Sequence, residues 1–310
     1  MSETQTLACS ITDAQGNYLR TFEAEIDISP ENDLLVRGVL RDHRFAFAHT
    51  WRLRAPAYEV IEASAQQLAG EFDPSLCERY AEIKGVRIGR GFSKTVISAL
   101  GAQPGAKEHL LLAIEMARVG QQVYQYTPEF EAQFPQGETP SEQAHSAWLK
   151  DRAYMSLANT CYAYRDESEA LFVGRDIRCG FASELTRPQP GEKRVFWRNK
   201  RLTIERTAAD GAPHFLCTSA MEDRIHDIKI EFTLGADGRI SDAHSRGLRL
   251  PYHGICEDPQ QRTPSLNGVQ VTEKFVQQFA EHVGSASGCT HLFDLSIDVM
   301  RLFDWPESGR

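Results

Sequence analysis

The chain has 310 residues, of which 41% are hydrophobic and 25% charged, and its formal net charge is −9. This length and composition allow two ordinary domains with hydrophobic cores. The negative charge argues against nucleic acid as a partner, and no stretch has the length and apolarity of a membrane span or a signal peptide. We therefore expect a cytoplasmic protein that acts on a small molecule, without nucleic acid or membrane as partner. A homo-oligomer is compatible with this composition.

The N-terminal third predicts strands first and helices second. Residues 17–29, 33–40, 45–55 and 58–68 alternate apolar and polar side chains, which is typical of an antiparallel meander. The spacing of apolar residues then becomes helical over 92–100 and 109–126, with the glycine- and proline-containing segment GAQPGAK between them.

The same order returns in the C-terminal third. Residues 226–232 and 238–248 read as strands, and 271–283 and 291–303 as helices. Identical residues recur at matching places in the two thirds, which indicates an internal duplication. The matched pairs are Gly85 with Gly268, Val86 with Val269, Phe92 with Phe275, His109 with His291, Asp42 with Asp223, His49 with His226, and Cys77 with Cys256.

These patterns predict an α+β protein with two tandem copies of one module, each an antiparallel β-meander followed by two helices, packed as a pseudo-dimer. We expect the first repeat, with a helical extension, over residues 1–186 and its core at about 40–126. The second repeat is expected over 187–310 with its core at about 220–304. Between them, residues 142–164 read as one long helix, and the proline-rich stretch from Thr186 to Arg194 as the boundary.

The sequence GCTHLFDL brings a thiol, a hydroxyl, an imidazole and a carboxylate to the start of the last predicted helix. The free N–H groups there favour a thiolate at Cys289 and a neutral imidazole at His291. The alternative is a packed helix start, with a buried cysteine, a capping threonine and a hydrogen-bonded histidine. Lys107 and Glu108 stand in the first copy where the second has Cys289 and Thr290, so the thiol beside the imidazole occurs once.

Acid–base chemistry is the function that these residues suggest without a metal. His226 or His291 would be the general base or acid, in a pocket where the two copies meet, and the groups expected to assist are Asp223, Tyr252, His253 and Lys229. Neither a GxGxxG nor a GxxxxGK[ST] pattern occurs, so no organic cofactor is expected. The seven cysteines form no CxxC pair, which favours reduced thiols over a disulfide framework.

The run from His226 through PYHGIC and LNGV to GCTHLFDL resembles the bacterial domain-of-unknown-function family numbered 2889, whose hallmark is Gly-Cys-Thr-His-Leu. The first copy resembles it in HTWRLRA, DPSLC and KGVRIGRGF, with KEHL in place of the hallmark. This resemblance implies a small, aromatic or phenolic, catabolic substrate. The best expectation is a carbon–carbon lyase of the retro-aldol type, because that reaction needs only a base, an acid and a stabilised carbanion.

More distantly, the order of elements is similar to the scaffold proteins of iron–sulfur cluster assembly, in which three cysteines and neighbouring His or Asp residues bind zinc or a cluster. The resemblance implies a metal site here, and the tetrahedral His₂Cys₂ set would be His226, Cys256, Cys289 and His291. Its final pair is Cys-x-His rather than adjacent, and a thiol counterpart of the first scaffold cysteine is missing near Ile225. A zinc or iron–sulfur scaffold module and a zinc-dependent hydrolase are therefore the alternatives to the lyase.

Overall fold

The computed structural model describes residues 7–180, 185–209 and 212–305, and it divides the chain into two compact units. The N-terminal unit contains residues 20–127 and 182–200, and the C-terminal unit contains residues 1–19, 128–181 and 201–310. This division differs from the expected boundary at residue 186, because the helical extension groups with the C-terminal unit. Residues 1–6, on which the expectation of no signal peptide partly rests, lie outside the described residues.

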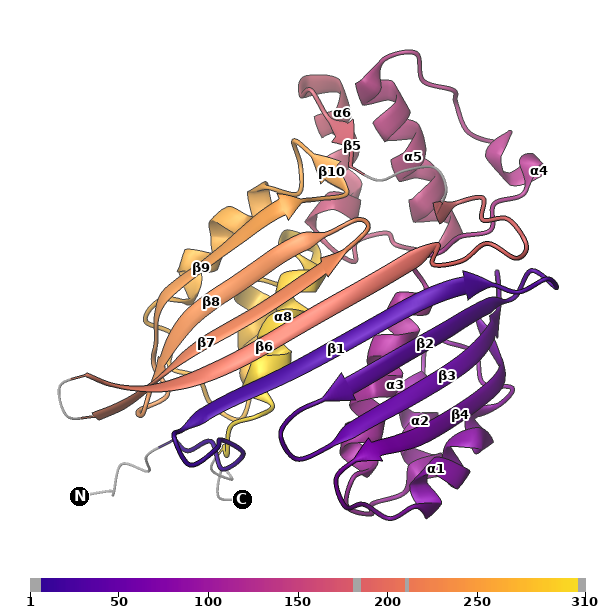
Figure 1. Ribbon diagram of the computed structural model, residues 1–310. Coiled ribbons are helices and arrows are strands. Elements are labelled where there is room, and N and C mark those ends of the chain that lie inside the picture. The colour runs from indigo at the N-terminus through magenta and orange to yellow at the C-terminus, as the bar shows by residue number, and fades with distance from the viewer. Residues whose placement is uncertain (1–6, 181–184, 210–211, 306–310) are drawn as a thin grey trace. The chain divides into compact units, whose positions relative to one another are not determined.

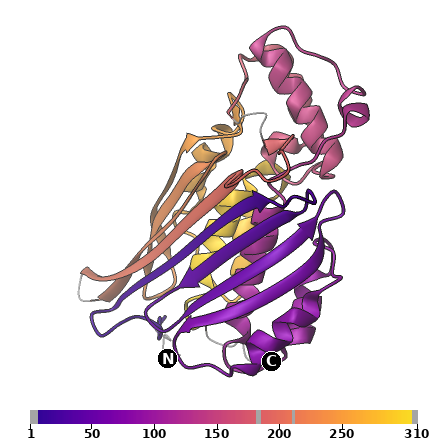
Figure 2. The same cartoon turned by 45° about the vertical axis from the view of Figure 1, so that its right-hand side comes forward.

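The N-terminal unit is a β-meander followed by helices, as the sequence predicts. Its strands lie in the order β4-β3-β2-β1 and pair antiparallel (Figure 1). Along β2, buried and half-buried residues alternate, so one face of the strand points into the core. Figures 1 and 2 both place the helices of this unit on one face of its strands. The elements are β1 (Asn17–Ile28), β2 (Leu34–Arg41), β3 (Ala46–Arg54), β4 (Glu59–Ala69), α1 (Ser75–Tyr80), η1 (Ala81–Ile83), α2 (Phe92–Leu100) and α3 (Ala106–Gly120).

Aromatic side chains fill the core of the N-terminal unit. The indole N–H of Trp51 on β3 donates to the hydroxyl of Tyr80 at 2.9 Å, and its ring meets Phe92 edge-on at 5.9 Å. Leu112 and Met116 on α3 are fully buried. Aromatic pairs in such geometry add stability beyond the area that they bury, so this cluster anchors α1, α2 and α3 to the sheet.

The C-terminal unit contains a helical segment and, after it in the chain, a second meander. Its sheet order is β6-β7-β8-β9, with β8 antiparallel to both neighbours, and α8 packs against β7 and β8. The elements are α4 (Pro128–Glu131), α5 (Pro140–Tyr154), η2 (Tyr162–Tyr164), η3 (Asp166–Ala170), α6 (Leu171–Gly174), β5 (Arg178–Cys179), β6 (Phe196–Ala209), β7 (Ala212–Asp223), β8 (Asp227–Gly235), β9 (Ile240–Arg249), β10 (Tyr252–His253), η5 (Asp258–Leu266), α7 (Phe275–His282), η6 (Ser285–Ser287) and α8 (Thr290–Met300).

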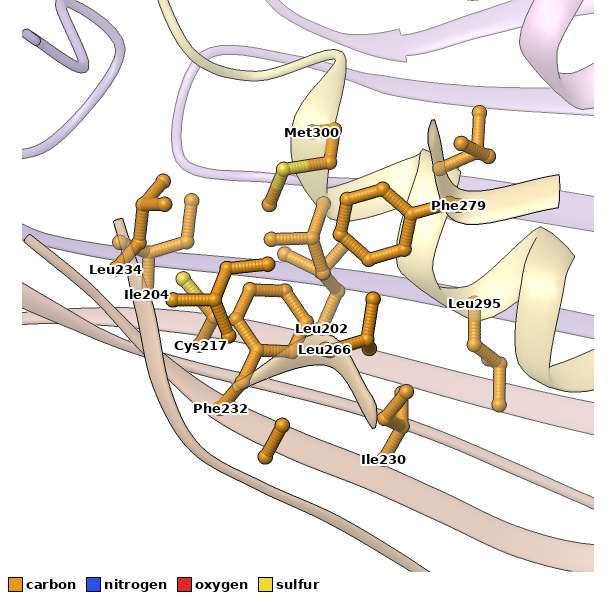
Figure 3. Close-up of a cluster of buried hydrophobic side chains, with 14 of the residues drawn as sticks. Leu202, Ile204, Cys217, Ile230, Phe232, Leu234, Leu266, Phe279, Leu295 and Met300 are labelled. Atoms are coloured by element: carbon orange, nitrogen blue, oxygen red, sulfur yellow. The ribbon is translucent and has the colours of Figure 1, made fainter. Parts of the chain in front are cut away.

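Two hydrophobic clusters hold the C-terminal unit together. In the larger one, shown in Figure 3, Phe232 of β8 lies among side chains from β6, β7, α7 and α8. In the smaller one, Trp148 of α5 packs with Tyr252 and Ile255, and its indole N–H donates to the carbonyl of Ala163 at 2.7 Å. This second cluster explains why the helical extension belongs to the C-terminal unit.

The α+β fold class is confirmed, and one helix is shorter than predicted. The helix expected over residues 142–164 ends at Tyr154, because Ser156 and Asn159 adopt positive φ angles of 53° and 59° that a right-handed helix excludes. Its start is well specified, since Thr139 forms a capping box with Glu142. Within the described residues, no helix has the length and apolarity needed to cross a membrane.

Candidate functional site

An aspartate–histidine pair occupies the tight turn between β7 and β8. One carboxylate oxygen of Asp223, Oδ1, accepts the backbone N–H of Ile225 at 2.7 Å and of His226 at 2.6 Å. The same oxygen lies 3.1 Å from Nδ1 of the His226 ring. Because a carboxylate can only accept, Nδ1 carries the proton and Nε2 is the basic atom of the neutral ring. Both side chains are buried, so the carboxylate fixes the orientation of the imidazole.

His291 at the start of α8 completes this arrangement. Its ring centroid lies 4.0 Å from that of His226, at an interplanar angle of 48°. Leu292 and Leu295 are buried on the face of α8 that packs against β7 and β8, and this packing holds the first turn of the helix in place. The fold therefore brings Asp223, His226 and His291, from two distant segments, into one Asp–His–His group.

The cysteine at the helix start is a thiol, contrary to the expected thiolate. Burial raises the pKa of Cys289 to about 12, and a neighbouring Cys161 adds to the rise. The backbone N–H groups of Leu292 and His291 at the helix start lower the pKa, but burial outweighs them. Burial also raises the pKa of Cys256 well above its ordinary value, with Cys161 and Cys289 as further causes. The positive end of a helix dipole lowers the pKa of an exposed thiol, whereas the thiol of Cys289 is largely enclosed.

The four predicted metal ligands form two pairs. The rings of His226 and His291 meet, and Cys256 and Cys289 interact electrostatically. Within residues 7–180, 185–209 and 212–305, no group of three or more His, Cys, Asp or Glu side chains is arranged to hold a metal ion. The four side chains therefore do not stand together as one tetrahedral set in this structure.

Tyr252 belongs to the smaller hydrophobic cluster and pairs with an aspartate of α5. Its hydroxyl donates to Oδ2 of Asp151 at 2.6 Å, and the hydroxyl of Tyr164 donates to the same oxygen at 3.2 Å. Tyr252 is fully buried in the smaller cluster, and burial raises the pKa of its hydroxyl well above the usual range, with the charge of Asp151 as the next cause. A tyrosine held in this way supports the packing of α5 against β10.

His253 and Lys229 pair with acidic residues nearby in sequence. Nδ1 of His253 lies 3.1 Å from Oε1 of Glu257, and both side chains are about two-fifths exposed. Lys229 pairs with Glu231 at 2.7 Å. Side chains alternate along β8, where Ile228 is buried in the core, so Lys229 projects from the opposite face of the sheet.

The N-terminal unit has a histidine pair of its own. Nε2 of His49 on β3 lies 2.9 Å from Nδ1 of His109 on α3, and both residues are 1% exposed. The ring of Phe47 lies 4.2 Å from that of His109, centroid to centroid, in a tilted arrangement. Burial lowers the pKa of His49 well below 6.5 and that of His109 to about 4, so both rings are neutral at neutral pH.

The β2–β3 turn and the β7–β8 turn have the same pattern of hydrogen bonds. Oδ1 of Asp42 accepts the backbone N–H of Phe45, and the N–H of Asp42 donates to the carbonyl of Phe45 at 3.0 Å. Asp223 makes the same two bonds with His226. The two turns therefore have the same hydrogen bonds, with Phe45 in the place that His226 holds in the other turn, whereas the sequence comparison pairs His49 with His226.

Sequence reasoning missed two residues that contact the predicted site. Cys161, read as part of a long helix, interacts electrostatically with Cys256 and Cys289, and the N–H of Tyr162 after it donates to the carbonyl of Gly288. Arg249 on β9 donates a hydrogen bond to the backbone carbonyl of Asp223. Neither has a local sequence signal, because both reach the site through tertiary contacts.

Every predicted site residue lies within the C-terminal unit, and most of that unit resembles a known family. No curated protein and no solved structure matches the chain. Residues 195–302, which include β6 to β9 and α8 with the Asp–His–His group, match the family described as "Protein of unknown function (DUF2889)".

Proposed function

We propose that the C-terminal unit is an acid–base enzyme centred on Asp223, His226 and His291. The observation that carries the proposal is the hydrogen bond from Nδ1 of His226 to Asp223, together with the 4.0 Å contact between the two imidazoles. A carboxylate-oriented imidazole beside a second imidazole can supply one base and one acid to the same substrate.

The reaction that we propose is carbon–carbon cleavage of the retro-aldol type on a small aromatic or phenolic compound. Nε2 of His226 accepts the proton of the substrate β-hydroxyl as a carbonyl forms at that carbon. The electron pair of the broken carbon–carbon bond remains on the departing fragment as an enolate, and protonated His291 donates a proton to it. The proton gained by His226 and the proton lost by His291 balance, so turnover needs no external oxidant or reductant.

A panel of phenolic β-hydroxy carbonyl compounds tests this assignment, with both cleavage products quantified. We expect one compound to yield an aldehyde and a second carbonyl fragment, and in deuterated water the second fragment should gain one deuterium at the former enolate carbon. His291→Asn should slow cleavage about 10²- to 10⁴-fold, the range for loss of a general acid. Cleavage at the wild-type rate in His291→Asn would show that another group protonates the enolate.

As alternatives, we propose a zinc or iron–sulfur scaffold and a zinc-dependent hydrolase. The electrostatic interaction between the thiols of Cys256 and Cys289 is the observation that supports a zinc or iron–sulfur scaffold, and a zinc hydrolase would use the same donors. Elemental analysis after anaerobic purification, with a visible absorption spectrum, tests them. Metal at one equivalent that is lost in Cys256→Ala would support the scaffold, and metal-free protein with full cleavage activity would dismiss it.

We also propose that the two units are diverged copies of one module. Gly85 and Gly268 have φ angles of 82° and 84°. Their N–H groups donate to Val60 on β4 at 2.7 Å and to Ile240 on β9 at 2.8 Å, respectively. The helices that follow, α2 and α7, both begin at a phenylalanine. Separately determined structures of the two units would test the proposal, and different strand connections would contradict it.

A further inference from the structure

Two segments of the C-terminal unit that are far apart in sequence run alongside each other at the start of α8. The backbone N–H of Tyr162 donates to the carbonyl of Gly288 at 2.8 Å. On the other side of Cys161, the hydroxyl of Thr290 donates to the carbonyl of Thr160 at 3.1 Å. These two bonds flank Cys161 on one segment and Cys289 on the other.

The pattern is that of an antiparallel pair in which Cys161 and Cys289 stand opposite each other. The threonine hydroxyl takes the place of the second backbone donor. Both cysteines have extended backbones, with φ and ψ of −155° and 176° at Cys161 and −117° and 123° at Cys289. In an antiparallel ladder this is a non-hydrogen-bonded pair, in which the two opposite residues have Cα atoms about 4.5 Å apart. Disulfides span Cα separations of about 4.4–6.8 Å, so the pair has a disulfide-compatible backbone.

The surroundings of the two sulfur atoms agree with this pairing. Each cysteine precedes a helical turn, and backbone N–H groups of that turn point at its sulfur. Those donors belong to Ala163 and Tyr164 for Cys161, and to His291 and Leu292 for Cys289. The two thiols also interact electrostatically. Both are free thiols in this structure.

We propose that Cys161 and Cys289 form a reversible disulfide at the start of α8, with a small-molecule disulfide as the oxidant. One cysteine thiolate attacks the oxidant, which releases one thiol and leaves a mixed disulfide. The second cysteine attacks that intermediate, which closes the Cys161–Cys289 bond and releases a second thiol. One oxidant disulfide is reduced to two thiols for each protein disulfide formed, and Cys256, which interacts electrostatically with both cysteines, offers a third thiol for exchange.

The disulfide would tie the segment after α5 to the first turn of α8. His291 lies two residues beyond Cys289, so the bond would hold one of the two imidazoles of the Asp–His–His group in place. This consequence for catalysis rests on the proposed function, whereas the disulfide itself does not. Because thiolate is the attacking species and both thiols have raised pKa values, the reaction should accelerate as pH rises.

Incubation of the full chain with oxidised glutathione, followed by blocking of free thiols and peptide mapping, tests the proposal without any substrate. We expect a Cys161–Cys289 linkage that dithiothreitol reverses. It should be absent in Cys161→Ala and retained in Cys256→Ala, with circular dichroism confirming that both variants are folded. A linkage closing so long a loop should raise Tm by roughly 10 °C.

Two results would overturn the proposal. One is a map in which Cys161 and Cys289 both stay unlinked after prolonged oxidation at alkaline pH. The other is a linkage of Cys289 to Cys256 in the wild-type chain. Loss of cleavage activity in His291→Asn bears only on the proposed function, so failure of one proposal can be told from failure of the other.

Discussion

The buried histidine pair of the N-terminal unit should make the protein less stable in mild acid. His109 has a pKa of about 4 in the folded chain because burial disfavours its charged form, against an ordinary value of 6.5. As pH falls below 6.5 the unfolded chain binds a proton at this position and the folded chain does not. The folded protein therefore keeps its full stability with respect to His109 above about pH 7. It loses this contribution as pH falls toward 4.

The size of the effect follows from the two pKa values. Between about pH 7.5 and pH 5.5, His109 alone should reduce the free energy of unfolding by about 1.3 kcal/mol, and over the whole window by about 3 kcal/mol. His49 shifts in the same direction and adds to the loss. The lower pH is set at about 5.5 because carboxylates titrate below it. Their titration would obscure the contribution of the histidines to the free energy of unfolding.

The assay is urea denaturation of the wild type and of His109→Gln at both pH values. Glutamine keeps a hydrogen-bonding group toward His49 but does not titrate, so the variant should lose less stability than the wild type on going to the lower pH. The expected difference between the two pH-dependent losses is about 1.3 kcal/mol. An identical loss in both proteins would refute the reasoning, because His109 would then have the same pKa folded and unfolded.

Three further substitutions probe the C-terminal unit. Asp223→Asn should lower kcat on the order of 10²-fold or more, since an amide no longer fixes the tautomer of His226, and an unchanged kcat would contradict this role. Tyr252→Phe should reduce the free energy of unfolding by about 1–3 kcal/mol in urea, because buried Asp151 loses one hydrogen-bond donor, while kcat stays near that of the wild type. Thr139→Ala removes the N-cap of α5 and should reduce the unfolding free energy by about 1 kcal/mol, and no change would indicate that the cap is replaced by water.

Local patterns predict much of this fold. The strands of the first meander, α2 and the closing helix all follow from alternation or helical spacing, because one face of each element packs against a core. Gly85 and Gly268 could be matched by sequence because each occupies a positive-φ position, which restricts the residue type.

The sequence patterns do not predict strands β6 and β7, and the composition of these segments explains why. The segment from Phe196 to Ala209 contains FWRNKR, which reads as a solvated basic run. In the structure Arg198 is buried on the same face as Phe196 and Leu202, so charge alone does not reveal which side of the strand faces the core. Tertiary contacts decide this, and a single sequence does not record them.

The candidate site was predictable in its residue types but not in its grouping. His291 stands out by its place at a helix start, and Asp223 with His226 by their spacing in a turn. That these three meet, while Tyr252 joins Asp151 instead, depends on how α8 and α5 pack in the C-terminal unit. The raised pKa of Cys289 likewise comes from burial, which sequence spacing does not reveal.

The central claim is that the Asp–His–His group carries the chemistry, and the turnover of His226→Asn tests it most directly. With a substrate from the phenolic panel, kcat should fall about 10²- to 10⁴-fold in this variant, as expected for loss of a general base. The matched control is His244→Asn, because His244 is exposed on β9 and has no part in the group, and it should keep the wild-type kcat. Wild-type turnover by folded His226→Asn would contradict the account.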